Sequence, residues 1–87
     1  MTRYRIPDTT LTQRVGDELV LLNLNDGTYH GLDEIGTRMV ELLGQGSALD
    51  PVVSSIVDEY ETSAEQVQTD LTALVQELKQ TGLLEEC

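Results

Sequence analysis

The chain has 87 residues, a length that suits one small domain with a single hydrophobic core. Its 16 acidic residues outnumber its 5 basic residues, and the formal charge is −11 at pH 7. Such a surface repels phosphate groups, so nucleic acids and anionic membranes are poor partners and cationic ligands are favoured.

Residues 1–8 are predicted to form an extended N-terminal arm, because Pro7 disfavours a helix at Ile6. The later segments that could act as linkers are short, and the chain contains no repeat and no low-complexity tract. Residues 9–87 are therefore expected to fold as one domain.

Three strands are expected next, over residues 9–15, 18–24 and 28–32. Turn residues separate them, first Gly16-Asp17 and then Asp26-Gly27. An Asp-Gly pair between strand-forming residues is a strong hairpin signal, because glycine adopts the positive φ that a tight turn needs. The three strands therefore predict an antiparallel sheet.

The second strand has one wholly apolar face, formed by Val20, Leu22 and Leu24, and this face is predicted to meet the helices. The register of the second hairpin stays open. A two-residue turn at Asp26-Gly27 would place Tyr29 on the inner face, whereas a three-residue turn would place His30 there.

The third strand has only the second strand beside it, because a helical pattern follows immediately. The first strand is expected to have the N-terminal arm nearby. The outward N–H and C=O groups of residues 28–32 therefore need a peptide or water as partner.

Two helices are predicted after the sheet. The first runs over residues 33–43, with Asp33 as its N-cap and Gly44 at its end. The second begins near Asp50-Pro51, with Asp50 as N-cap and proline at the first helical position.

A third, longer helix begins at Ser63, whose hydroxyl and Gln66 form a Ser-x-x-Gln capping box, and it stops before Gly82. One apolar stripe follows it, made of Val67, Leu71, Leu74, Val75 and Leu78. Three strands followed by three helices predict an α+β domain that resembles a winged helix-turn-helix. The third helix has Lys79 as its single basic residue, which argues against DNA binding.

No catalytic or metal-binding constellation emerges from the sequence. His30 is the only histidine, and no recognisable motif places a nucleophile or a paired carboxylate near it. A calcium loop centred on Gly27 fails, because Leu22 and Leu24 would occupy ligand positions. Cys87 is the only cysteine, so an intrachain disulfide is impossible and a reducing, cytoplasmic location is expected. No cofactor is expected.

Several short motifs nevertheless carry a family resemblance through their order and spacing. They are Leu21-Leu22-Asn23-Leu24, Asp26-Gly27-Thr28-Tyr29, Gly31-Leu32-Asp33, Gly36, Asp70-Leu71, Leu74 and Thr81-Gly82-Leu83-Leu84. With this pattern the chain resembles PqqD-like proteins, and most closely the standalone leader-recognition proteins of lasso-peptide gene clusters. One departure is Asn23-Leu24-Asn25, which replaces a Pro-Glu step typical of the pyrroloquinoline-quinone members.

The resemblance implies a RiPP recognition element, a non-catalytic domain that binds the leader of a ribosomally made precursor. It implies three partners: the leader peptide, a transglutaminase-like leader peptidase and a macrolactam cyclase. The leader would add as a strand to the edge of residues 28–32 and dock against the third helix. The candidate peptide-binding residues are Thr28, Tyr29, His30, Gly31, Leu32, Val67, Asp70, Leu71, Leu74 and Leu78. Asp70 matches an acidic position typical of the family.

Two alternatives remain open from the sequence. The domain could be a small acidic adaptor that self-associates through the same sheet edge, or a PqqD-like chaperone of another modified-peptide pathway. A cofactorless enzyme centred on His30 and Tyr29 would need a pocket that a chain of this size is not expected to provide.

Overall fold

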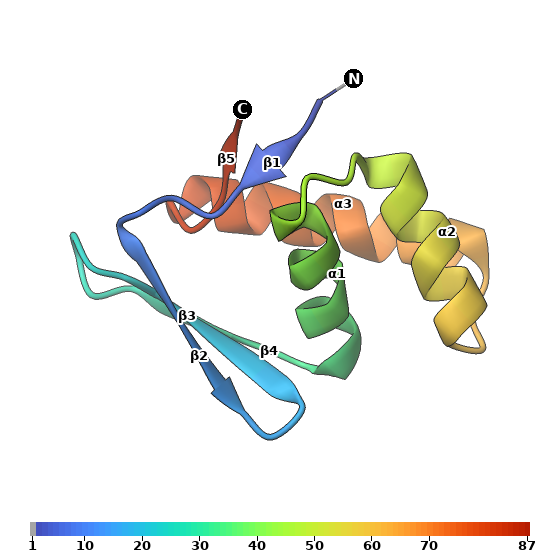
Figure 1. The fold of residues 1–87 in the computed structure, drawn as a ribbon, viewed down its shortest axis with the longest axis horizontal. Helices are drawn as coiled ribbons and strands as arrows, with labels where there is room; N and C mark the ends of the chain where they lie inside the picture. The colour runs from blue at the N-terminus through green and yellow to red at the C-terminus, as the bar shows by residue number, and fades with distance from the viewer. Residues whose placement is uncertain (1) are drawn as a thin grey trace.

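The computed structural model describes residues 2–87, in which a three-stranded antiparallel sheet is followed by three helices, as the sequence predicts (Figure 1). A second, two-stranded pairing joins the chain ends. The elements are β1 (Tyr4–Arg5), β2 (Thr10–Val15), β3 (Glu18–Asn23), β4 (Tyr29–Leu32), α1 (Glu34–Gly44), α2 (Leu49–Glu59), α3 (Ala64–Gln80) and β5 (Glu85–Glu86). The fold class is therefore α+β.

The strand order of the sheet is β2-β3-β4, and the hairpin between β3 and β4 has a register that neither predicted turn produces. Leu22 pairs with Tyr29 and Leu21 pairs with His30, and the connection between the two strands spans residues 24–28. Gly27 has a φ of 79° in this connection, and its N–H donates to the Asn23 carbonyl at 2.8 Å. His30 consequently shares the inner face with Leu21, while Tyr29 faces outward.

The inner face of β3 is the opposite of the predicted one. Leu19, Leu21 and Asn23 are buried beneath the helices, whereas Val20 and Leu22 are half-buried and Leu24 is 58% exposed. The prediction was wrong because it sorted the two faces by apolar character alone. An asparagine can lie in a core when both polar atoms of its amide are hydrogen-bonded, and Asn23 meets this condition.

Asn23 connects the hairpin to the end of α3. Its Nδ2 donates to the Thr81 carbonyl at 2.9 Å, and its Oδ1 accepts from the Asn25 N–H at 2.9 Å. Gly82, with a φ of 75°, leaves room for this contact, since a Cβ there would lie 2.9 Å from Asn23 Nδ2. The buried amide thus replaces an apolar contact with two specific hydrogen bonds.

We expect Asn23→Ala to destabilise the domain by about 1–3 kcal/mol, because it leaves the Thr81 carbonyl and the Asn25 N–H without their partner. Urea unfolding followed by circular dichroism measures the loss. Asn25→Ala is the matched control, since the Asn25 side chain is exposed and its backbone N–H remains. Equal stabilities of the two variants would contradict the role of the Asn23 amide.

The hydrophobic core lies between the inner sheet face and the three helices. In Figure 1, α1 stands beside the sheet and α3 runs behind α1 and α2. The buried apolar residues come from every layer: Tyr4, Leu19, Leu21, Leu32, Met39, Val40, Leu42, Leu43, Val52, Ile56, Val67, Leu71, Val75, Leu78, Leu83 and Leu84.

Two helix starts follow the predicted caps. The Asp33 side chain accepts from the Gly36 N–H at 2.8 Å, and the Ser63 hydroxyl accepts from the Gln66 N–H at 3.1 Å. The second half of the predicted capping box is replaced, because the Gln66 side chain donates to Asp70 at 2.9 Å. Both caps satisfy backbone N–H groups that a helix leaves unpaired.

The helix α1 ends at Gly44 as predicted, whereas the predicted start of α2 was wrong. α2 begins at Leu49 with Ala48 as its N-cap, and the buried Ala48 makes no side-chain cap hydrogen bond. Asp50 therefore lies in the first turn, where its carboxylate interacts favourably with the positive end of the helix dipole. At the end of α1, Gly46 rather than Gly44 adopts the left-handed conformation, with a φ of 95°.

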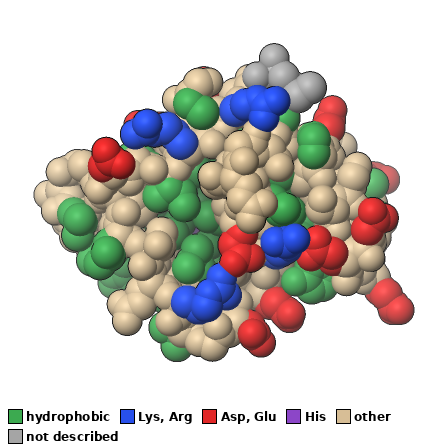
Figure 2. Space-filling model, viewed as in Figure 1, with side chains coloured by type: hydrophobic (Ala, Val, Ile, Leu, Met, Phe, Trp, Pro, Cys, Tyr) green, Lys and Arg blue, Asp and Glu red, His purple; other side chains and the backbone are tan. Residues whose placement is uncertain are grey.

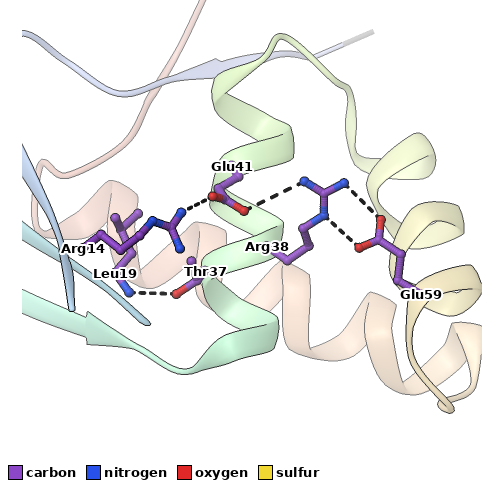
Figure 3. Close-up of polar contacts among 6 residues, drawn as sticks. All are labelled: Arg14, Leu19, Thr37, Arg38, Glu41 and Glu59. Carbon is purple, nitrogen blue, oxygen red and sulfur yellow. Dashed lines mark hydrogen bonds and ion pairs between the residues drawn. The ribbon is translucent and has the colours of Figure 1, made fainter. Parts of the chain in front are cut away.

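Polar contacts on one side of α1 fix the sheet and α2 to this helix (Figure 3). Arg38 forms a bidentate ion pair with Glu59, with N···O distances of 2.8 and 3.1 Å. This hydrogen bonding lowers the pKa of Glu59 and raises the pKa of Arg38. Glu41 also pairs with Arg14 of β2, and the Leu19 N–H donates to the Thr37 hydroxyl at 2.9 Å.

The N-terminal arm pairs with the end of the chain. β1 and β5 lie side by side in Figure 1, with Tyr4 opposite Glu86 and Arg5 opposite Glu85. Tyr4 is only 7% exposed. The arm leads directly into β2 but does not pair with it, because β1 pairs with β5 and the Tyr4 ring is buried in the core.

Candidate functional site

A groove of about 420 Å³ lies where β4, the first turn of α1 and the middle of α3 meet. β4 leads directly into α1, which places the first helical turn beside the strand. The residues that line the groove are His30, Gly31, Leu32, Asp33, Ile35, Gly36, Met39, Asp70 and Leu74.

The inner part of the groove is apolar. Leu32 and Met39 are buried, with exposures of 5% and 2%, and Ile35 and Leu74 are half-buried at its sides. The polar groups are exposed or half-buried, and they come from three different elements: His30 from β4, Asp33 from the start of α1 and Asp70 from α3. An apolar floor with a few converging polar groups is typical of a binding site.

Half of the sequence-predicted site residues come together here: His30, Gly31, Leu32, Asp70 and Leu74. Thr28 and Tyr29 lie outside the groove lining, and both are exposed. Val67, Leu71 and Leu78 also lie outside it, because they are core residues with exposures of 2%, 1% and 0%.

Sequence reasoning missed the contribution of α1, which supplies Asp33, Ile35, Gly36 and Met39. A signal was present: Ile35 and Met39 are four residues apart and therefore share one helix face. Gly36 is buried, and a Cβ at this position would lie 3.1 Å from the Asp33 Oδ1 that caps the helix. Because Gly36 has no Cβ, the Asp33 cap and the end of β4 can lie close to the first turn of α1.

The outer edge of β4 carries backbone groups without a strand partner among residues 2–87. The Asn23 N–H donates to the Thr28 carbonyl at 2.7 Å, which identifies this residue pair as hydrogen-bonded. Hydrogen-bonded and non-bonded pairs alternate in an antiparallel ladder, so the N–H and C=O groups of Tyr29 and Gly31 point away from β3. A Cβ built on Gly31 would meet nothing within 4 Å.

The opposite edge, on β2, is open as well within the described chain, since β1 pairs with β5 rather than with β2. Only the β4 edge adjoins the groove. The two edges therefore differ in what they offer to a peptide: β4 combines free backbone groups with an apolar cavity, and β2 has the backbone groups alone.

Two side-chain contacts lie at or near β4. The Asp26 carboxylate accepts from the Thr28 N–H at 2.9 Å, and this hydrogen bond lowers the pKa of Asp26. At the groove, His30 Nδ1 lies 3.6 Å from an oxygen of Glu77 on α3. The ring thus lies near α3.

The outer sheet face is unusually apolar. Leu11, Val15, Leu24 and Tyr29 are the exposed large hydrophobic residues of the described chain, and all lie in β2, β4 or the connection after β3. Figure 2 shows hydrophobic side chains at the surface over the sheet, while most acidic side chains lie over α1 and α2. The face turned away from the helices therefore keeps apolar surface in contact with solvent.

Other kinds of site are not seen in residues 2–87. The helices described there are too short or too polar to cross a membrane. No three histidine, cysteine or carboxylate side chains of these residues gather closely enough to hold a metal ion.

The chain is similar to one family model and to two solved structures. The family model described as coenzyme PQQ synthesis protein D (PqqD) matches residues 18–84. The solved structure of TbiB1 in complex with the TbiA(beta) leader peptide is 37% identical, with a TM-score of 0.86 over 93% of this chain and 94% of that chain. No curated protein matches the chain significantly.

A second solved structure is a lasso peptide synthetase B1 complexed with the leader peptide. It is 25% identical to this chain, with a TM-score of 0.87 over 95% of this chain and 98% of that chain. Both structures thus have the size and the fold of the whole chain, and both contain a bound leader peptide.

Proposed function

Because this chain belongs to the PqqD family, we propose that it is a RiPP recognition element that binds the leader peptide of a lasso-peptide precursor. The observation that carries the proposal is the groove of about 420 Å³ directly beside the open edge of β4. A peptide needs both backbone partners and side-chain pockets for sequence-specific strand addition, and these two features provide them. The two solved leader complexes of the same fold support this assignment.

In the proposed complex the leader extends the sheet as a fourth strand. Its backbone pairs with the outward groups of Tyr29 and Gly31, and alternate side chains enter the groove. Leu32 and Leu74 contact these apolar side chains, and His30 and Asp70 border them. Val67, Leu71 and Leu78 contribute from below, because they hold α3 at the right distance from the strand.

We infer that the domain has no catalytic activity of its own. It presents the precursor to two enzymes, a leader peptidase and a macrolactam cyclase. This role is consistent with a groove whose titratable residues are one histidine and two aspartates, with no serine, cysteine or lysine in its lining. The domain would then act in the cytoplasm, where precursors are made.

One observation favours a second candidate function. Both sheet edges are open within residues 2–87, and the outer sheet face carries exposed hydrophobic residues, so two copies could pair their sheets. Sedimentation measurement of the molecular mass, with and without leader, separates the candidates. A dimer that dissociates when the leader binds would show that both use the β4 edge.

We expect the isolated domain to bind its unmodified cognate leader with an affinity on the order of micromolar or tighter, as backbone pairing and one or two apolar anchors would give. Isothermal calorimetry with the cognate leader peptide measures it. A scrambled leader of equal composition is the control. Equal heats for both peptides would contradict the proposal.

A further inference from the structure

We propose that the peptide segment in the groove carries a lysine or arginine next to its apolar anchor, and that Asp70 and Asp33 select this basic side chain. The inference rests on the peptide-binding function proposed above and specifies the chemistry of its ligand. The groove is the binding site; the two carboxylates determine which side chains it prefers.

The first argument is that the groove carboxylates lack a basic partner. The chain has 5 lysine and arginine residues, and each is engaged elsewhere. Their partners lie on other surfaces: Arg3 with the Gly46 carbonyl, Arg5 with Glu85, Arg14 with Glu41, Arg38 with Glu59, and Lys79 with Glu86. The groove therefore has negative charge that no lysine or arginine of the chain neutralises.

The second argument is that both carboxylates are held in place with one oxygen free. Asp33 Oδ1 accepts from the Gly36 N–H at 2.8 Å, and Asp70 Oδ1 accepts from Gln66 Nε2 at 2.9 Å. The other oxygen of each has no hydrogen-bond donor within residues 2–87. An oriented carboxylate with a free oxygen is a ready acceptor for an ammonium or guanidinium group.

The third argument is the layering of the groove. Lysine and arginine bury their methylene stems against apolar surface and keep the charged head near water. Leu32 and Met39 offer this apolar surface at the bottom, and the exposed Asp33 and Asp70 stand at the rim. A neutral polar side chain would gain less from the carboxylates, and an acidic one would be repelled by them.

His30 does not take over this role. Its Nδ1 already faces Glu77 at 3.6 Å, so a charge on the imidazole would first be compensated by that glutamate. The net charge of −11 acts in the same direction as the local carboxylates, since it attracts a cationic segment at long range.

The test replaces each lysine or arginine of the cognate leader in turn by glutamine and measures binding by fluorescence anisotropy. We expect one replacement to weaken binding about two- to fivefold, as expected for an ion pair with an exposed carboxylate. In the Asp70→Asn domain the same replacement should have a smaller effect, because only the Asp33 carboxylate remains to pair with the basic side chain. Raising the salt concentration should weaken wild-type binding more than Asp70→Asn binding.

Two further variants make the test specific. Asp33→Asn removes the second charge while keeping a good helix cap. Asp58→Asn, at an exposed position of α2 outside the groove, makes the same change in net charge and should leave the preference intact. Circular dichroism confirms that each variant is folded.

The outcomes separate this inference from the proposed function. A wild-type domain that does not bind the leader contradicts the proposed function itself. A leader that binds well without any lysine or arginine, or a charge preference that is the same in the Asp70→Asn and Asp58→Asn domains, overturns only the selection by the groove carboxylates.

Discussion

Replacing Gly31 by proline is expected to lower leader affinity about tenfold or more while the domain stays folded. The Gly31 N–H points away from β3, so proline removes a donor that the leader needs and leaves the ladder to β3 intact. The ring also occupies space that the incoming backbone would fill. Calorimetry with the cognate leader measures the loss, and urea unfolding measures the stability.

Two companion variants define the cause. Gly31→Ala adds a Cβ that meets nothing within 4 Å and keeps the N–H, so the fold should be unaffected and leader binding should fall less than with proline. His30→Pro removes a donor on the side facing β3 and should destabilise the sheet itself. Full leader binding by a folded Gly31→Pro domain would show that the peptide does not pair with this edge.

Leu71→Ala is expected to cost about 2–5 kcal/mol of stability, because it creates a cavity at a fully buried position. This is a large fraction of the roughly 5–15 kcal/mol that stabilises a small domain. Leu74→Ala should cost less, since Leu74 is only half-buried and lines the groove. Its main effect should be on the leader, with affinity lowered about fivefold or more.

Urea unfolding and leader calorimetry on Leu71→Ala and Leu74→Ala test whether Leu71 acts in the core and Leu74 in the groove. Leu78→Ala is a second core control, with a side chain that is 0% exposed and absent from the groove. Binding should be measured at a temperature where each variant is folded. A Leu71→Ala domain that is stable but does not bind, with Leu74→Ala showing the reverse, would contradict the assignment of core and groove.

The sequence by itself determined the features that depend on neighbouring residues. The order of strands and helices, the caps at Asp33 and Ser63, and the left-handed Gly82 after α3 all follow from backbone requirements within a few positions. The free edge of the third strand also follows locally, because a helix begins directly after it. These signals predicted the fold class, and five of the nine residues that line the groove were among the candidate binding residues.

Tertiary structure decided what depends on distant residues. Asn23 lies on the inner face of the sheet, where its amide reaches Thr81, 58 positions away, and the apolar Val20 and Leu22 lie half-buried on the outer face. The same choice of face places His30 in the groove and Tyr29 outside it. Which face of a strand is buried depends on whether its polar groups find partners there, and the sequence pattern of a strand does not contain those partners.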